Sequence, residues 1–308
     1  MPDRIYTEYL NRNHGFFYTV KDRLYHGRTK YQEIELIDTD EYGTVLLLDN
    51  VTQVAETVDW QYHEPLAHFP LLAHSKPERV LVVGGGDGGT VREVLKHPVT
   101  HVDFVELDEE VVSFSRRHLP AVHQGAFEDQ RVRLRFQDGR AWIEEHPDTY
   151  DVILMDMTDP FGPSRMLYTR EFYKLVRRAL RSDEGLFAMH SESPVARPVA
   201  HRCIERTLGT AFPVVRCAYA FIQMYATYWS FAISSPTTDI ARVPGDLVDA
   251  RLAERGISGL RMIDGPSWES MQVALPYIRS IPADVPTITD ENPVFPDHFS
   301  AAGADQQD

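Results

Sequence analysis

The stretch Val80-Leu-Val-Val-Gly84-Gly-Gly-Asp87-Gly-Gly-Thr90 decides the fold. A β-branched apolar run, typical of a buried strand, leads into glycines around one aspartate, and residues 91–97 then have a helical pattern. Thr90 and Glu93 have the spacing of a capping box, which predicts that the helix begins there. Glycines in such a turn permit positive φ and let a ligand approach the backbone, so the stretch predicts a nucleotide-binding unit. Its G-x-G-x-x-G spacing is not specific by itself.

The aspartate in this turn, Asp87, is the most informative residue of the stretch. Turns of this kind usually present backbone N–H groups to an anion, such as a pyrophosphate or a carboxylate. A carboxylate at this position repels an anion and attracts a cation. Two interpretations stay open here: Asp87 binds a cationic group of the ligand, or it only caps the helix.

Residues before this stretch predict a small β-rich unit. Three segments with strand patterns are separated by turn residues, which indicates an antiparallel sheet or lid: residues 32–38, 44–48 and 51–55. A helix over residues 62–73 is expected to lead out of this sheet, and Lys76-Pro77 marks the predicted boundary. We therefore expect an N-terminal β domain with a linker helix over residues 1–75 and a larger domain over residues 76–308.

From Arg79 onward, strand patterns alternate with helix patterns, the later helices lying near residues 169–180 and 195–208. After the strand at Val80, further strands are predicted at residues 101–106, 131–136, 150–156, 185–190, 214–224 and 228–234. This order predicts an α/β fold with a doubly wound, mostly parallel sheet. The gap between the last two strands is too short for a crossover helix, so these two should pair antiparallel.

Four carboxylates each stand at the carboxyl end of a predicted strand: Asp87, Glu106, Asp138 and Asp156. Ligands bind at this edge of open α/β sheets, so the four side chains should converge on one cleft. Glu106 stands roughly 20 residues after Gly84, the spacing of an acid that accepts hydrogen bonds from ribose hydroxyls. Asp138-Gly139 suits an adenine amino group, with the glycine leaving room for the base. The alternatives are an exposed strand-end acid and a plain turn.

The segment Asp156-Met-Thr-Asp159-Pro-Phe-Gly-Pro163 is the second distinctive stretch. Its two carboxylates, combined with two prolines and a glycine, indicate a rigid loop over the cleft. One carboxylate can bind an ammonium group and the other can take its proton. A primary amine with a pKa near ~10.4 must lose that proton to act as a nucleophile. The alternative is a solvated acidic loop.

The composition limits the possible partners. The chain has 308 residues, 43% hydrophobic and 25% charged, with a formal net charge of −15. These values are typical of a globular protein with one or two domains. The acidic balance argues against nucleic acid and anionic membranes as partners and permits cationic small molecules. We expect a cytoplasmic protein for two reasons. The two cysteines form no disulfide framework, and the sequence shows no signal segment or long apolar run.

Neither a metal nor a tightly bound cofactor is expected. The run from His63 to His68 resembles a zinc pair, but it lacks the H-E-x-x-H spacing and Pro65 interrupts it. Ser, Cys and Lys residues form no recognisable nucleophile arrangement. An aromatic cluster should lie mostly in the core, with some members lining an apolar channel for a methylene chain: Tyr219, Phe221, Tyr225, Tyr228, Trp229 and Phe231.

Taken together, these residues resemble the spermidine synthases, the polyamine aminopropyltransferases. The resemblance extends in order over about residues 5–235. It rests on a set of short motifs at residues 48–49, 53–56, 62–64, 83–93, 105–108, 138–139 and 150–163. The resemblance implies a Rossmann-like domain of the class I methyltransferase type, a small N-terminal antiparallel β domain, and a homodimer or homotetramer.

The resemblance also implies a reaction. Such enzymes transfer the aminopropyl group of decarboxylated S-adenosylmethionine to an amine and release methylthioadenosine. Asp87 would bind the donor's ammonium and Asp156 would be the general base. The nucleoside would be held by Gln32, Glu106, Asp138, Gly139 and Pro163. The acceptor amine would face Tyr62, His63, Asp159 and Tyr225.

Departures from the family pattern concern the acceptor. After the fifth strand the family has Ala-Gln, whereas this chain has Met189-His190, followed by Ser191-Glu192. We expect His190 and Glu192 to lie where the far end of an acceptor rests. Putrescine, giving spermidine, is the default acceptor. An extra acid suits a longer or more basic amine, such as agmatine, cadaverine or spermidine.

Three other functions fit part of the pattern. A methyltransferase that uses S-adenosylmethionine on a small amine fits the fold, but Asp87 and the loop carboxylates argue against it. A nicotinamide-dependent dehydrogenase fits the glycine spacing, but no hydride-transfer partner is visible. A non-catalytic binder of polyamines or nucleosides fits as well, and the presence of both Asp156 and Asp159 argues against it.

Overall fold

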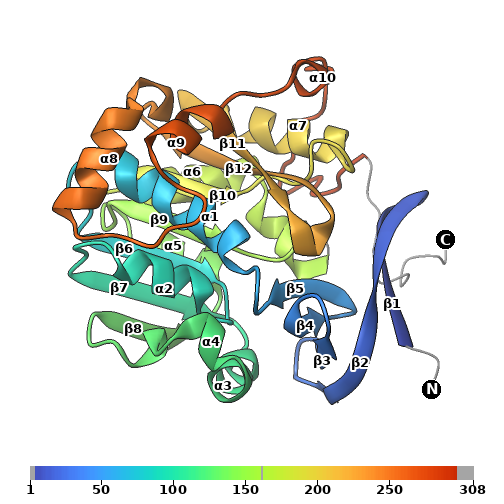
Figure 1. The fold of residues 1–308 in the computed structure, drawn as a ribbon. Helices are drawn as coiled ribbons and strands as arrows, with labels where there is room; N and C mark the ends of the chain where they lie inside the picture. The colour runs from blue at the N-terminus through green and yellow to red at the C-terminus, as the bar shows by residue number, and fades with distance from the viewer. Residues whose placement is uncertain (1–3, 161, 297–308) are drawn as a thin grey trace.

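The computed structural model describes residues 4–160 and 162–296, apart from the side chains of residues 162 and 163. Figure 1 shows a small N-terminal sheet, in blue, beside a larger sheet that is packed against helices. In the described part of the chain, no helix combines the length and apolar character needed to cross a membrane.

The N-terminal sheet has five antiparallel strands in sequence order: β1 (Arg4–Asn11), β2 (His14–Arg28), β3 (Glu33–Thr39), β4 (Gly43–Leu48) and β5 (Val51–Ala55). Strands β3 to β5 confirm the three predicted segments. The first two strands form a long hairpin at the edge of the molecule (Figure 1). The sequence pattern predicts β structure there but no defined strands, because β2 is almost wholly exposed beyond Val20 and lacks a clear alternation.

The larger sheet has seven strands in the order β11-β12-β10-β9-β6-β7-β8. Strands β6 to β10 are parallel, and β12 pairs antiparallel with both β10 and β11. This arrangement confirms the doubly wound α/β fold and the antiparallel final pair. The bounds are β6 (Arg79–Gly84), β7 (His101–Glu106), β8 (Val132–Phe136), β9 (Val152–Asp156), β10 (Leu186–His190), β11 (Val214–Ile222) and β12 (Thr227–Ser235).

Both faces of the larger sheet are buried. Successive strand residues point to opposite faces, and helices cover each face. Val80 and Val82 pack with Phe69 of helix α1 (Trp60–Ala73) on one face. Leu81 packs with Phe172 of α6 (Arg170–Ala179) on the other. The near-continuous apolar runs in the sequence follow from this double burial.

The remaining helices connect the strands and form the C-terminal segment. They are α2 (Gly89–Leu95), α3 (Glu109–His118), α4 (Pro120–His123), α5 (Gly139–Glu145), α7 (Pro198–Leu208), α8 (Gly245–Glu254), α9 (Gly265–Met271) and α10 (Pro276–Arg279). Short 3₁₀ turns are η1 (Ala126–Glu128), η2 (Gly162–Leu167), η3 (Gln223–Tyr225) and η4 (Ile240–Arg242). The predicted capping box is wrong, because α2 begins at Gly89 after a left-handed Gly88, and Thr90 lies inside the helix.

Helix α1 packs against α2 and the strands β9 to β12, so it is associated with the larger sheet. The C-terminal segment holds it at both ends. Near its start, the Glu64 carboxylate accepts hydrogen bonds from the N–H groups of Arg261 and Met262 at 2.9 and 2.7 Å. At its end, Arg251 donates to Ala73 O and Arg255 to Leu71 O. These carbonyls lie in the last turn, where helices lack internal partners. The predicted division of the chain between residues 75 and 76 stays a prediction.

Candidate active site

A cavity of about 730 Å³ lies at the carboxyl ends of β6, β7, β8 and β9 and is closed on its other side by the N-terminal sheet. The predicted convergence of the four strand-end carboxylates is confirmed, because all four line this cavity. Of the predicted site residues, those in the lining are Gln32, Tyr62, His63, Asp87, Glu106, Asp138, Gly139, Asp156, Asp159, His190, Glu192 and Tyr225. Pro163 lies in η2, and its side chain is outside the described residues.

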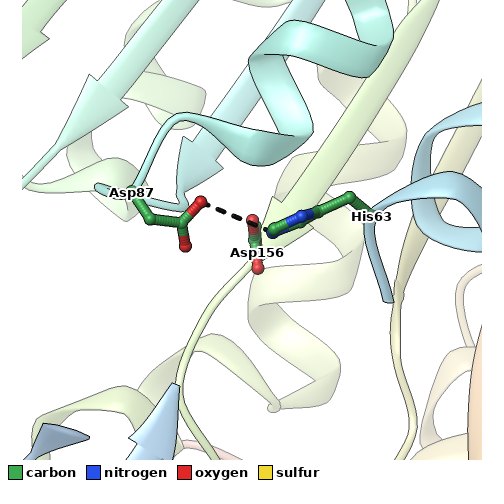
Figure 2. A group of neighbouring side chains, drawn as sticks. All are labelled: His63, Asp87 and Asp156. Carbon is green, nitrogen blue, oxygen red and sulfur yellow. Dashed lines mark ion pairs between the residues drawn. The ribbon is translucent and has the colours of Figure 1, made fainter. Parts of the chain in front are cut away.

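Three charged side chains meet at one end of the cavity. Figure 2 shows Asp87 from the turn after β6, Asp156 from the end of β9 and His63 from α1, all pointing toward one another. One polar atom of each lies within 4.8 Å of the others. The two carboxylates therefore share a small volume with one histidine, and this volume is open to the cavity.

Asp156 is held in place by its neighbours. Thr90 Oγ1 donates a hydrogen bond to its Oδ2 at 2.6 Å. A Cβ at Gly85 would lie 2.4 Å from this same oxygen, and Gly85 has a φ of +74°, so glycine is required there. Burial, followed by the negative charge of Asp87, raises the pKa of Asp156. A raised pKa suits a carboxylate that must accept a proton near neutral pH.

His63 lies between two carboxylates. Its Nδ1 is 3.1 Å from Asp59 Oδ2, and its Nε2 is 3.4 Å from Asp87 Oδ1. Burial by itself favours the neutral ring, but Asp87 and Asp59 outweigh it and raise the pKa of His63 to about 9. The ring is therefore a cation at neutral pH. Asp59 was not predicted for the site; it also pairs with Arg92 at 2.7 Å, which fixes its orientation.

Asp87 contributes both to the start of α2 and to the cavity, and its binding of a cationic group of the ligand stays a prediction. Its Oδ1 accepts a hydrogen bond from the N–H of Gly89, the first residue of α2, at 2.7 Å. The same carboxylate lines the cavity and contacts His63. His63, Asp87 and Asp156 also have the spacing of a metal site. A protonated imidazole offers no lone pair to a metal, which makes an ammonium the better match for this group. The expectation of no metal stays a prediction.

The opposite end of the cavity carries the residues predicted for the nucleoside. Glu106 ends β7, and its Oε1 accepts a hydrogen bond from the N–H of Asp108 at 3.0 Å. Burial raises the pKa of Glu106 to about 7. Gln32 Nε2 donates to Asp108 Oδ2 at 3.2 Å, which joins the N-terminal sheet to α3. Asp108 thus organises this end, although the sequence indicated only that it opens a helix.

Asp138 and Gly139 also have structural roles. Asp138 Oδ1 caps α5 by accepting a hydrogen bond from the N–H of Ala141 at 2.9 Å, while the residue stays exposed in the cavity wall. A Cβ at Gly139 would lie 2.4 Å from Val83 Cγ1. The packing of α5 against β6 therefore explains the glycine, and the predicted room for a base stays a prediction.

The carboxylates predicted for the acceptor are paired with an arginine that the sequence did not indicate. Arg197, at the start of α7, lies 2.7 Å from Asp159 and 3.1 Å from Glu192. Arg197 therefore supplies a countercharge to Glu192, and the expectation that this acid suits a longer or more basic amine stays a prediction. His190 Nε2 lies 2.7 Å from Tyr168 Oη, and burial lowers the pKa of His190, which keeps the ring neutral.

Aromatic side chains form part of the cavity wall. Tyr225 Oη donates to Gln53 O at 3.0 Å, and its ring packs against Tyr62 and Trp229. Tyr225 and Trp229 of the predicted aromatic cluster line the cavity together with Tyr62. The apolar channel expected there stays a prediction. Glu8 of β1 also lines it and was missed, because an acid in a half-exposed hairpin carries no local signal.

Comparisons with known proteins agree with this geometry. A family model described as the spermine/spermidine synthase domain matches residues 59–242, and one described as the spermidine synthase tetramerisation domain matches residues 5–56. The chain is 35% identical over 283 residues to a polyamine aminopropyltransferase of Nitrosomonas europaea, covering 91% of this chain and 86% of the relative. It is 37% identical over 299 residues to polyamine aminopropyltransferase 2 of Hyperthermus butylicus, covering 96% and 98%.

Solved structures give the same result. A crystal structure of spermidine synthase in complex with the transition-state analogue AdoDATO superposes with a TM-score of 0.84 at 30% identity, covering 91% of this chain and 94% of that one. That of spermidine synthase from Thermotoga maritima superposes with a TM-score of 0.81 at 28% identity, with the same shares covered. With its strand-end carboxylates, its N-terminal sheet and these matches, the chain belongs to the spermidine synthase family of alkyl-group transferases.

Proposed function

We propose that this enzyme transfers the aminopropyl group of decarboxylated S-adenosylmethionine to a diamine, with putrescine as the default acceptor and spermidine as the product. The observation that carries the proposal is the meeting of Asp87 and Asp156 beside His63 in one cavity. The names of the relatives and the transition-state analogue bound to the similar crystal structure support it.

The charge of Asp87 favours the decarboxylated donor. The aminopropyl chain of that donor ends in an ammonium, which can pair with Asp87. S-adenosylmethionine carries a carboxylate next to its amine, and Asp87 repels it. A charged hydrogen bond of ~1.5–3 kcal/mol gives roughly a ten- to hundred-fold preference before this repulsion is counted.

The reaction is a direct displacement. The acceptor nitrogen attacks the methylene carbon next to the sulfonium, so that a C–N bond forms as the C–S bond breaks. The bonding electron pair goes to sulfur, which leaves as the neutral thioether of methylthioadenosine. Before the attack, the acceptor ammonium gives a proton to Asp156, whose pKa is raised by burial and by Asp87, and the free amine is then the nucleophile. The product leaves as a secondary ammonium. The protein otherwise holds two cations close together in a reactive orientation.

The proposal is tested by incubating the enzyme with decarboxylated S-adenosylmethionine and a panel of di- and triamines, with product identification by mass. We expect spermidine and methylthioadenosine from putrescine and no methylated amine from S-adenosylmethionine. Asp156→Asn should reduce kcat by at least a hundredfold and leave methylthioadenosine binding within threefold of the wild type. Wild-type turnover in this variant would rule out Asp156 as the base.

We further propose that the enzyme is a homotetramer assembled through the N-terminal sheet. The match of residues 5–56 to a tetramerisation domain supports this, as do the exposed apolar side chains Ile5, Tyr9 and Phe17 on β1 and β2. Such side chains in a row on an edge hairpin favour association. Light scattering on the purified enzyme should give four times the chain mass, and a monomer would contradict the proposal.

A further inference from the structure

A guanidinium lines the cavity beside Asp159 and Glu192, two carboxylates predicted to face the acceptor. The side chain of Arg197 is only 6% exposed and lines the cavity wall. Its Nη1 lies 2.7 Å from Asp159 Oδ2 and 3.1 and 3.2 Å from the two oxygens of Glu192. Its Nε donates to Leu10 O of β1 at 3.0 Å. One side chain therefore joins the loop after β9, the loop after β10 and the N-terminal sheet.

This arrangement fixes the charge available to a substrate. Asp159 and Glu192 would otherwise offer two negative charges to an incoming polyamine. Arg197 already supplies the cation between them, and a second cation in the same place would be repelled by it. A buried carboxylate needs a partner, so the arginine also makes this part of the cavity stable without substrate.

Glu8 differs from these two carboxylates. It lies on the same face of β1 as Leu10 and lines the same cavity. Its Oε2 accepts hydrogen bonds from the N–H of Thr52 at 2.8 Å and the hydroxyl of Tyr6 at 3.2 Å, both neutral donors. Within residues 4–160 and 162–296, no ion pair of Glu8 with a basic side chain is found. Glu8 is therefore free to pair with a substrate cation.

On the basis of the proposed function, we infer that Arg197 is a selectivity residue that restricts the acceptor to an amine with one distal cation. Its guanidinium takes the place that a second distal ammonium would occupy between Asp159 and Glu192, and Glu8 is left to pair with the first. The enzyme thus accepts diamines and discriminates against triamines, although the number of acidic residues at this end suggests the opposite.

The test replaces the cation and compares acceptors. Arg197→Met keeps the length of the side chain and leaves Asp159 and Glu192 without a countercharge, which a triamine can supply. We expect the ratio of kcat/KM for spermidine over kcat/KM for putrescine to rise at least tenfold. Arg197→Lys retains a cation and should keep this ratio within threefold of the wild type. If both variants lower the two efficiencies in parallel and leave the ratio unchanged, Arg197 only braces the fold and the inference is wrong.

Two further variants separate charge from packing. Arg197→Met with Glu192→Gln restores the wild-type net charge of the group, and the ratio should fall back to within threefold of the wild type. Arg202→Met removes an arginine of the same helix that pairs with Glu205 away from the cavity, and it should not move the ratio. A ratio that stays high in the charge-restored variant would contradict the electrostatic argument.

A binding measurement keeps this inference distinct from the proposed function. Calorimetric titration of putrescine and spermidine into the enzyme saturated with methylthioadenosine requires no turnover. We expect the preference for putrescine over spermidine to be at least tenfold in the wild type and to be lost in Arg197→Met. Equal preference in both proteins would overturn the inference even if the transfer reaction occurs. Absence of transfer with any amine would refute the proposed function alone.

Discussion

The imidazole Nε2 of His63 lies 3.4 Å from Oδ1 of Asp87, the carboxylate expected to bind the ammonium of the donor. On the proposed function, the protonated ring and the donor ammonium should therefore compete for the negative charge of Asp87. Because Asp87 and Asp59 raise the pKa of His63 to about 9, the ring holds its proton at neutral pH and loses it as the pH rises through this value.

Donor binding should consequently strengthen with pH. If the ammonium replaces the proton of His63, the Kd of decarboxylated S-adenosylmethionine should fall by roughly tenfold per pH unit between pH 7 and the pKa of about 9. Methylthioadenosine has no ammonium, and its Kd should stay constant over the same range. His63→Gln should flatten the donor profile. Calorimetry at several pH values gives these constants, and a flat wild-type profile would exclude the competition.

The hydroxyl of Thr90 should lower the pKa of Asp156, the proposed base. It donates to Asp156 Oδ2 at 2.6 Å and favours the charged carboxylate. Thr90→Val removes the donor and should raise the pKa of Asp156, so that the acidic limb of the kcat/KM profile moves to higher pH. Loss of a charged hydrogen bond of ~1.5–3 kcal/mol should lower kcat/KM roughly ten- to a hundred-fold at neutral pH. Thr90→Ser keeps the hydroxyl and serves as the control; an unshifted profile in the valine variant would refute the role.

Gly85→Ala should abolish turnover. The added Cβ would lie 2.4 Å from Asp156 Oδ2, and the φ of +74° adds backbone strain. Gly125→Ala is a matched control, since Gly125 has a φ of +82° but no neighbour within 4 Å of the added atom. Both variants should lose about 1–2 kcal/mol of stability from the left-handed backbone. Only Gly85→Ala should lose activity, and an active Gly85→Ala enzyme would show that Asp156 can move freely.

Removal of metal ions should leave the activity of the enzyme unchanged. The group of His63, Asp87 and Asp156 has the spacing of a metal site, but we expect its partner to be an ammonium. Dialysis against a chelator should leave kcat and KM within experimental error of the untreated enzyme. Loss of activity that one divalent cation restores would contradict this expectation.

The C-terminal arginines should stabilise the fold without acting on the substrate. Arg255 donates to Leu71 O at 2.7 Å and to His74 O at 2.9 Å. Arg255→Met should lower the free energy of unfolding by about 2–3 kcal/mol, because these acceptors lose their partners. Arg242→Met, at an 88% exposed side chain, should change it by less than about 0.5 kcal/mol. Urea unfolding measures both free energies. Equal stabilities of the two variants would exclude a stabilising role for the hydrogen bonds of Arg255 to the end of α1.

Much of the site could be predicted because the sheet is parallel. Strand ends are visible in the sequence as apolar runs that stop at an acid, and topology brings those ends together. This reasoning correctly brought Asp87, Glu106, Asp138 and Asp156 to one cavity. It also gave the antiparallel β11–β12 pair, since the connection between these strands is short.

Other features had no local signal. Arg197 meets Asp159 and Glu192 only in the folded chain, and nothing in its neighbourhood in sequence indicates an ion pair across the cavity. Glu8 lines the cavity only because the folded chain brings the hairpin of β1 and β2 next to it, as the hydrogen bond from Arg197 to Leu10 O shows. The helix α9 did carry a signal, since Asp264 and Ser267 form a capping box before Trp268. That spacing could have located the helix from the sequence alone.

The hydrogen bonds from Arg251 and Arg255 to the end of α1 also have a consequence for folding during translation. Arg251 and Arg255 bind carbonyl groups near the end of a helix made about 180 residues earlier, as the bonds to residues 71–74 show. A nascent chain that has left the ribosome only as far as residue 242 contains both matched family segments but cannot yet close this contact. The helix that carries Tyr62 and His63 can therefore make these contacts only after residues 251–255 have been synthesised.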